Sequence, residues 1–456
     1  MNIGPRMKVA IVAGIAVSAG LFEFGGSGFA AQETATWTLS VNPLRSPAAS
    51  NTGEPQLTVS SRGVLLSWVE HAGSTTTLRF AERTATGWTE PRTVASGQDW
   101  SINPIDVPSV LRLSNGTLVG QWLQRAGTSM HTNDVRLSYS KDDGRTWAPP
   151  FTPYRDTTQH ERLFAFPFEM PDGALGVVWL DGRPMPPDTA SAGRAGQNHA
   201  PGGADHGRPP GTGHQDHQGG AQHGAPANMG DMSLRFAAFD NAWKQTGDTP
   251  IDQRVCECCS TAAVVTSEGV VAAYRNRSDD EVRDIYVSRL EQGRWTEGSV
   301  VHAENWRIPM CPINGPALSA TGRDVVIAWY TAKQDDAHAY LGFSRDAGRT
   351  FGQPIRLDDR TSLGRVDVEL LPDGSAIASW IEFDDGRAQF RVRRVTRDGA
   401  RSGAVTVAGL GSGGRASGTP RIVRHGDELL FAWTESNDGG RQVRTAVVRL
   451  PRHVTR

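Results

Sequence analysis

Hydrophobic and polar positions repeat in one pattern along most of the chain. Each copy has an apolar strand, a tight turn containing Gly, Asn or Asp, and a second apolar strand that ends in an aromatic residue. The aromatic markers are Trp68, Trp122, Trp179, Tyr274, Trp329, Trp380 and Trp433. Consecutive markers lie 51 to 57 residues apart, except for a gap of 95 between Trp179 and Tyr274. The pattern predicts seven copies of one structural repeat, with an insertion in the third.

Two further strands follow in most copies, such as "LRFAER" and "GWTEPRTV" in the first. Four short antiparallel strands in each repeat are typical of a β-propeller blade, because radial repetition leaves only short sheet edges exposed. We expect an all-β fold, a β-propeller of four-stranded blades over residues 34–453, with seven blades favoured and six possible. The turns "SNG", "PDG" and "GD" supply residues that tolerate the positive φ of tight hairpins.

The two ends of the chain complement each other in this scheme. The seventh repeat ends at "VRTAVVRLPRH" without a fourth strand, whereas the strand pattern "ATWTLSVNPL" at residues 35–44 belongs to no repeat. We predict that this N-terminal strand completes the last blade and closes the ring. An ordinary edge strand is the alternative.

Two repeats carry a sharper motif between their third and fourth strands. The segments "SKDDGRTW" (Ser140–Trp147) and "SRDAGRTF" (Ser344–Phe351) both fit S-x-D-x-G-x-T followed by an aromatic residue. They resemble the Asp-box repeats of the sialidase (neuraminidase) superfamily, and the blade pattern extends the resemblance over most of the mature chain. The resemblance implies a propeller fold. It does not imply activity, because Asp boxes lie away from the active site in that superfamily.

The same resemblance makes an exo-sialidase, or another glycoside hydrolase, an alternative function. Sialidases use a tyrosine nucleophile beside a carboxylate, an aspartate as acid/base and three arginines that bind the substrate carboxylate. Tyr154 is the only obvious loop tyrosine. Its neighbours are Arg155, Asp156, Glu161 and Arg162. The family's R-I-P signature precedes its first Asp box, but "WRIP", which contains Arg307, follows the first box here. No catalytic residue is therefore assigned.

The N-terminus has the pattern of a secretory signal over residues 1–31. Arg6 and Lys8 precede the apolar run Val9–Phe22, and small residues offer a cleavage point near Ala30 or Ala31. The run is shorter than the roughly 20 residues that a spanning helix needs. We expect a soluble, exported chain, periplasmic or extracellular, with no transmembrane segment after cleavage. The net charge of -2 does not favour nucleic acid as a partner.

The four cysteines occupy equivalent places in adjacent repeats. Cys256, Cys258 and Cys259 precede the first strand of the fourth repeat, and Cys311, beside Met310, precedes that of the fifth. Because segments leading into the first strands lie on one face of a propeller channel, we expect these residues to converge there.

Three interpretations of this convergence remain open. An even number of cysteines in an exported protein favours disulfides, and a Cys256–Cys311 bridge between blades is plausible. Clustered thiolates near a thioether instead suit a soft metal ion, copper(I) first and zinc second. A catalytic cysteine is the third interpretation, although no clear histidine partner accompanies it.

The gap between the third and fourth markers predicts a disordered insertion over residues 183–231. This segment is rich in Gly, Pro and Ala and has almost no apolar content. It contains His199, His206, His214, His217 and His223. These histidines are either a copper, nickel or zinc scavenger or incidental residues of a solvated linker. The charged loop "YRNRSDDEVRDIY" (Tyr274–Tyr286) either binds a polar ligand or satisfies its own charges through salt bridges.

Our leading hypothesis is an exported sialidase-like propeller that acts mainly by binding. Cys256, Cys258, Cys259, Cys311 and Met310 form its copper site, and the His-rich insertion assists. The expected partner is a metal ion, or else a polar small molecule or glycan at the channel face. A protein-interaction scaffold with structural disulfides is a further alternative. The sequence does not indicate the oligomeric state.

Overall fold

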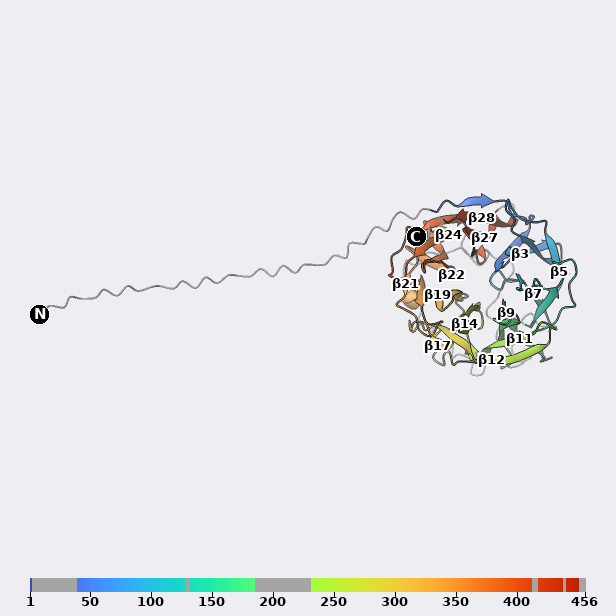
Figure 1. Ribbon diagram of the computed structural model, residues 1–456, viewed down its shortest axis with the longest axis horizontal. Coiled ribbons are helices and arrows are strands. Elements are labelled where there is room, and N and C mark those ends of the chain that lie inside the picture. Colours follow the sequence, from blue (N-terminus) through green and yellow to red (C-terminus); the bar gives the residue numbers. More distant parts are fainter. Residues whose placement is uncertain (2–38, 128–131, 185–230, 412–416, 438–439, 451–456) are drawn as a thin grey trace, which may run out of the picture. The chain divides into compact units, whose positions relative to one another are not determined.

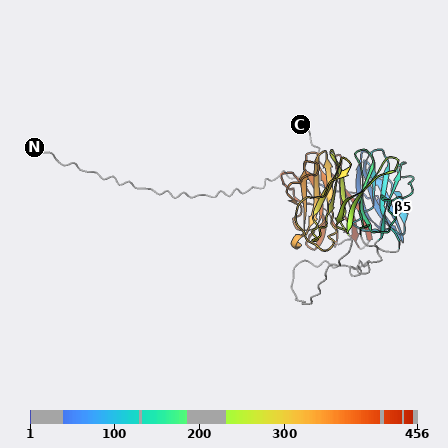
Figure 2. The ribbon, with the colours of Figure 1, turned by 90° about the horizontal axis from the view of Figure 1, so that it is seen from below.

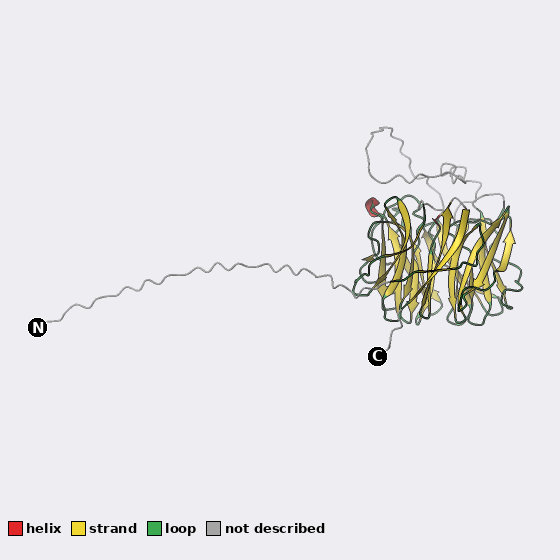
Figure 3. Ribbon diagram, turned by 90° about the horizontal axis from the view of Figure 1, so that it is seen from above, coloured by secondary structure: helices red, strands yellow, loops and turns green. Residues whose placement is uncertain are grey.

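Seven antiparallel sheets contain nearly all the regular structure of the described chain (Figure 3). The computed structural model describes residue 1 and residues 39–127, 132–184, 231–411, 417–437 and 440–450. The predicted signal over residues 1–31, and the insertion over 183–231 apart from Arg183, Pro184 and Asp231, lie outside these residues. The described part contains the 3-10 turn η2 (Lys333–Asp335), and no helix there could span a membrane.

Each sheet is one blade, whose strands succeed one another from the ring centre outwards (Figure 1). The innermost strands are β2 (Thr52–Ser60), β6 (Ser109–Arg112), β9 (Arg162–Glu169), β13 (Ala262–Thr266), β18 (Ala317–Thr321), β22 (Thr361–Leu370) and β26 (Arg421–His425). The second strands are β3 (Gly63–Ala72), β7 (Leu118–Arg125), β10 (Leu175–Asp181), β14 (Gly269–Arg275), β19 (Asp324–Thr331), β23 (Ala376–Asp384) and β27 (Glu428–Asn437).

The outer half of each blade has the remaining strands. The third strands are β4 (Thr75–Glu82), β8 (Asn133–Ser140), β11 (Met232–Phe239), β15 (Ile285–Glu291), β20 (His338–Ser344), β24 (Arg387–Val395) and β28 (Gly440–Arg449). The outermost strands are β5 (Arg92–Gly97), β12 (Gln245–Val255), β16 (Arg294–Trp295) with β17 (Ser299–Val300), β21 (Ile355–Arg356), β25 (Val405–Gly409) and β1 (Asn42–Leu44). In the second blade an isolated bridge between Leu137 and Phe151 stands where the fourth strand would lie.

The ring closes as the sequence predicts. Strand β1 pairs antiparallel with β28, placing Asn42 opposite Val447 and Leu44 opposite Thr445. The Thr445 hydroxyl also donates to the Leu44 carbonyl at 2.8 Å. The last blade therefore contains the first and the last strand of the described chain, and the outer edge of β28 is paired rather than exposed. The prediction of seven blades closed by the N-terminal strand is confirmed.

The two Asp boxes are turns held by their own side chains. In the first, Asp142 accepts hydrogen bonds from the Thr146 amide at 2.9 Å and the Thr146 hydroxyl at 2.7 Å. These bonds, with one from Ser140, lower the pKa of Asp142 to about 2. Trp147 then leaves the turn to pack edge-on against Phe80 of the first blade. The motif thus fixes a turn and joins two blades, as its sequence predicts.

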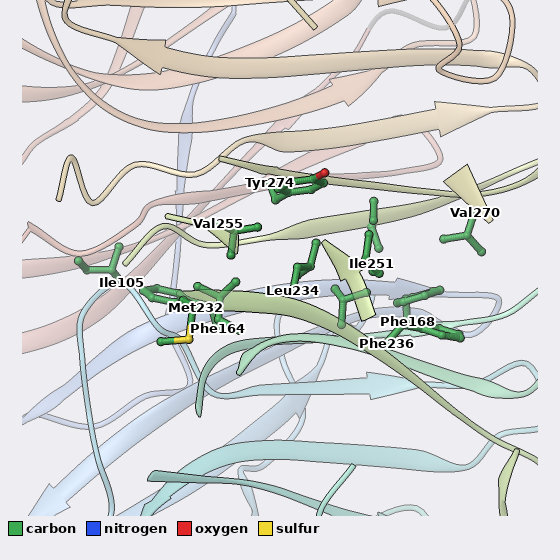
Figure 4. Packing of buried hydrophobic residues seen from close by; sticks show 14 residues of the cluster. Ile105, Phe164, Phe168, Met232, Leu234, Phe236, Ile251, Val255, Val270 and Tyr274 are labelled. Carbon is green, nitrogen blue, oxygen red and sulfur yellow. The ribbon is translucent and has the colours of Figure 1, made fainter. Parts of the chain in front are cut away.

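Apolar packing between blades three and four forms the core beneath the cysteine segments (Figure 4). Leu234 and Val255 of the third blade are buried in one cluster with Tyr274 of the fourth. All seven aromatic markers of the repeat are buried as well. Because Val255 is the last residue of β12, this core anchors the chain immediately before Cys256.

Removal of the closing strand tests the role of the ring. A chain that begins at Arg45 lacks β1, so the β28 edge is unpaired and the Leu44 contact is lost. We expect the midpoint of thermal unfolding to fall by roughly 5 °C or more relative to a chain that begins at Leu39. Scanning calorimetry measures the midpoints, and equal values for the two chains would contradict the role assigned to β1.

Candidate functional site

One face of the ring brings the cysteines together. Seen edge-on, the strand connections gather at the two ends of the blades (Figure 2). The segments leading into β13 and β18 lie at the same end as the loop joining β14 to β15. The first of these segments contains Cys256, Cys258 and Cys259, and the second contains Cys311. The predicted convergence from adjacent blades is observed.

The four sulfur atoms form two pairs. Cys258 and Cys311 are joined by a disulfide between the blades. The Cys256 thiol donates to the sulfur of Cys259 at 3.0 Å and also lies 3.8 Å from the sulfur of Cys258. The sulfurs of Cys256, Cys258 and Cys311 are all within 4.8 Å of one another. The sequence interpretation of a Cys256–Cys311 bridge is wrong, because Cys256 lies inside the fold beside Cys259.

The backbone explains why Cys256 lies inward. Its amide donates to the Arg275 carbonyl at 2.9 Å, and Val255 forms a bridge with Asn276. The segment is therefore held along the end of β14, where the Cys256 side chain is only 1% exposed. The chain then turns, leaving Cys258 half-buried at the surface facing the fifth blade.

Two buried arginines surround the free sulfur pair. Arg283 donates to the Cys256 sulfur at 3.4 Å, and also to Glu257 at 2.9 Å and Glu281 at 2.8 Å. Arg275 donates to the carbonyls of Asn314, Arg283 and Tyr330 at 2.6 to 3.0 Å. Because the Arg275 guanidinium donates to three carbonyl oxygens, none of these bonds neutralises its charge with a carboxylate. The sulfur pair therefore lies in an electropositive environment.

The surroundings shift the pKa values of the two thiols in opposite directions. Burial is the largest influence on Cys259 and raises its pKa, but the Cys256 hydrogen bond, the charge of Arg275 and the Asn314 amide together lower the pKa to about 7. Burial and the neighbouring Cys259 raise the pKa of Cys256. Both shifts favour deprotonation of Cys259 over Cys256, in agreement with the hydrogen bond that the Cys256 thiol donates to Cys259. Thiolates are the form of cysteine that binds metals and attacks disulfides.

The other predicted metal ligands have different positions. Met310 is beside the disulfide in sequence, but its side chain is 61% exposed at the rim. The five histidines at positions 199 to 223 lie outside the described residues. Among the predicted metal ligands that the structure describes, the four cysteines lie together and the Met310 side chain is exposed.

The charged loop after β14 is largely satisfied by its own salt bridges, and it also builds the site. Arg277 pairs with Glu281 at 2.6 Å, and Arg283 joins Glu281 to Glu257 beside the thiols. The sequence analysis identified this loop as charged but did not connect Arg275 or Arg283 with the cysteines. The loop follows the marker Tyr274 directly and therefore lies on the cysteine face, and this position could have connected the two arginines with the cysteines.

The tyrosine considered as a sialidase nucleophile does not lie in an open site. Tyr154 is in a loop, as predicted, but it is 4% exposed and packs in the core with Trp179. Its hydroxyl donates to Asp134 at 2.7 Å, and burial raises its pKa above the usual range. Arg162 stacks on its ring and pairs with Asp156 at 2.9 Å. This arrangement stabilises blade packing and keeps the phenol protonated.

The remaining residues of that constellation are dispersed. Arg155 donates to Gln245 at 3.0 Å, whereas Arg307 is exposed and lies 3.9 Å from Asp280. A polar cavity of about 420 Å³ lies elsewhere, between blades five and six, with His338 and Arg356 among its lining residues. It shares no residue with the predicted catalytic constellation.

A buried carboxyl connects the second blade to the cysteine segment. Asp106 accepts a hydrogen bond from the Phe164 amide at 2.6 Å, and the Phe164 carbonyl accepts one from the Thr261 hydroxyl at 3.1 Å. Burial raises the pKa of Asp106 to about 7, against the opposing effect of the Phe164 amide. Sequence analysis missed this group, since a single Asp in a loop has no distinguishing pattern.

Solved structures of other proteins have a similar fold. The polysaccharide lyase Uly1 has a TM-score of 0.50 at 11% identity, over 92% of this chain and 94% of that chain. With two structurally intact Asp boxes in seven blades, this similarity decides the fold. The chain is a seven-bladed β-propeller.

Two further solved structures are similar to this chain with lower TM-scores. A protein of unknown function from Dyadobacter fermentans has a TM-score of 0.48 at 13% identity, over 91% of this chain and 99% of that chain. The NanB sialidase from Streptococcus pneumoniae has a TM-score of 0.43 at 10% identity, over 85% and 83% of the two chains. No family model matches the sequence, and no curated protein sequence matches it. At sequence identities of 10 to 13%, no residue role is transferred from these structures to this chain.

The pH dependence of stability tests the state of Asp106. Because its folded pKa of about 7 exceeds the ordinary value of 3.8, ionisation favours the unfolded chain, and the cost grows as pH rises from about 4 to about 7. We expect Asp106→Asn to equal the native chain at pH 4 and to be more stable at pH 8, by on the order of 2–4 kcal/mol.

Urea unfolding at pH 4, 6 and 8 measures this difference. Asp279→Asn is the control, because Asp279 has a 96% exposed side chain. A native-like loss of stability between pH 4 and 8 in the Asp106→Asn variant would assign that loss to another group.

Proposed function

We propose that this protein is an exported binding protein whose cysteine cluster at the channel face binds a soft metal ion. Copper(I) is the first candidate and zinc the second. The proposal rests on one observation, the buried Cys256–Cys259 pair, whose sulfurs are 3.0 Å apart and free of the neighbouring disulfide. The His-rich insertion is proposed as an accessory that captures the ion.

The coordination available favours copper(I) over zinc. Zinc is usually held by four ligands, at about 2.3 Å from each sulfur. While Cys258 and Cys311 form a disulfide, only Cys256 and Cys259 offer thiol sulfurs to an ion. Copper(I) prefers soft thiolates and is stable at low coordination number. The two sulfurs must separate to admit any ion, and reduction of the disulfide would add Cys258 as a third ligand.

Charge supports the same choice. A copper(I) ion with two thiolates has one net negative charge, which is costly to bury without a positive neighbour. Arg283 contacts Cys256 directly, and the charge of Arg275 acts on Cys259. A zinc ion with two thiolates is neutral and gains less from the two guanidinium groups. The electropositive site therefore suits the copper(I) complex.

The two alternatives from the sequence have less support. Tyr154, the tyrosine on which the exo-sialidase or glycoside hydrolase interpretation depends, is buried and hydrogen-bonded to Asp134. A scaffold with purely structural disulfides leaves unexplained why Cys256 and Cys259 remain as thiols beside a closed disulfide. A polar small molecule or glycan remains a second ligand class, for which the cavity beside His338 provides space.

Titration with copper(I) in competition with a chromophoric chelator tests the proposal. We expect the full mature chain to bind about one ion. The double variant Cys256→Ser/Cys259→Ser should lose this binding, because it removes both free thiols. The matched variant Cys258→Ser/Cys311→Ser should retain it, since the buried pair stays intact. Retention by the first variant, or no stoichiometric binding by the native chain, would refute the proposed site.

Arg283, which contacts the Cys256 sulfur, provides a separate test of charge compensation. We expect Arg283→Gln to weaken copper(I) binding by about tenfold, as for other groups that support a metal ligand. Arg277→Gln is the control, because Arg277 pairs with Glu281 and Glu257 but makes no contact with a sulfur among its hydrogen bonds. Circular dichroism verifies that both variants fold. Equal affinities would show that the charge of Arg283 does not stabilise the bound ion.

A further inference from the structure

We propose that the four cysteines also form a thiol–disulfide relay, in which the disulfide moves between a rim pair and a buried pair. The rim pair is Cys258 and Cys311, and the buried pair is Cys256 and Cys259. The activity is chemically distinct from metal binding and needs no bound ion. It is carried by the short sulfur distances that connect the two pairs.

The first exchange occurs between Cys256 and the rim disulfide. The first step moves the Cys256 proton along its hydrogen bond to Cys259, a transfer that the order of the two pKa values opposes, and the resulting Cys256 thiolate is the nucleophile. The Cys256 sulfur lies 3.8 Å from that of Cys258, close to contact distance for two sulfur atoms. Attack forms a Cys256–Cys258 bond and breaks the Cys258–Cys311 bond, so that Cys311 leaves as a thiolate.

The second exchange moves the disulfide into the interior. Cys259 transfers its proton to the Cys311 thiolate through water, and attacks the sulfur of Cys256, its neighbour at 3.0 Å. A Cys256–Cys259 bond forms, the Cys256–Cys258 bond breaks, and Cys258 leaves as a thiolate. One disulfide and one thiol proton are present before and after, so the relay is an isomerisation that needs no external oxidant.

The two positions of the disulfide differ in their exposure to solvent. Cys256 and Cys259 are 1% and 2% exposed, whereas Cys258 and Cys311 are half-buried at the channel face. When the disulfide is inside, two thiols lie where a small thiol or disulfide reagent can reach them. The relay would thus connect a buried dithiol with low-molecular-weight disulfides at the surface, which accept its two electrons by further exchange.

The surrounding backbone fixes one partner and leaves the other free to separate. Cys256 is held by the hydrogen bond of its amide to Arg275, and Arg283 orients its sulfur. Cys311 instead lies in a segment without strand structure between Trp306 and β18. A released Cys311 thiolate is therefore able to withdraw, as a leaving group in disulfide exchange must.

Mapping of the disulfide in the full chain tests the relay. The metal-free protein is incubated with a catalytic amount of glutathione, quenched in acid, unfolded and alkylated. Cleavage after Glu257 separates Cys256 from Cys258 and Cys259, so mass spectrometry can distinguish the isomers. We expect two one-disulfide forms, one alkylated at Cys256 and Cys259 and the other at Cys258 and Cys311.

Two single variants separate the steps. In Cys259→Ser the relay should stop after the first exchange, leaving a Cys256–Cys258 bond and Cys311 open to alkylation. In Cys256→Ser the first nucleophile is absent, and alkylation of Cys311 should be at least about tenfold slower. The two variants remove neighbouring buried thiols of equal size, so each controls for the packing change in the other.

Two results would overturn the relay. One is a native chain alkylated only at Cys256 and Cys259 at every time point, which needs no variant to fold. The other is equal alkylation of Cys311 in Cys256→Ser and Cys259→Ser. Because the experiment excludes metal ions, its failure would leave the copper proposal standing, and loss of copper binding would leave the relay untouched.

Discussion

Contact between neighbouring blades is the constraint on which both the fold and the site depend. At the cysteine face this contact is extreme, because a Cβ placed on Gly315 would lie 1.9 Å from the Ser260 carbonyl oxygen. Only glycine permits the segments of blades four and five to approach so closely. The same approach brings Cys311 to Cys258. The ring closure by β1 holds all seven blades in the circle that makes such contacts possible.

Burial of charge beside the thiols has to be offset locally. Arg275 and Arg283 are almost fully buried, and an unpaired guanidinium in such a place would be strongly destabilising. Arg275 is stabilised by three carbonyls, and Arg283 by Glu257 and Glu281. These partners hold the positive charges in place whether or not the sulfurs carry a negative charge. Before any ligand arrives, the positive charge of Arg283 is therefore balanced by two glutamates, whereas the hydrogen bonds of Arg275 leave its charge in place beside the sulfurs.

The sequence predicts the fold well because its signals are local and repeated. The aromatic markers report burial directly, and an Asp box specifies its own turn through Asp142 and Thr146. The cysteine pairing was not predictable in the same way. Alignment of repeats placed Cys256 opposite Cys311, but the hydrogen bond of Cys256 to Arg275 turns that side chain inward. A pairing that depends on tertiary contacts between blades cannot be obtained from spacing alone.

The two proposals for the cysteines are chemically coupled. A metal ion held by Cys256 and Cys259 requires both sulfurs as thiolates, whereas the relay uses the same sulfurs to form a disulfide. The two states exclude each other, so copper(I) at the buried pair would hold the disulfide at Cys258 and Cys311. Conversely, movement of the disulfide inward would eject the ion toward the two rim thiols and the exposed Met310. The position of one disulfide thereby determines whether the buried pair is able to hold metal.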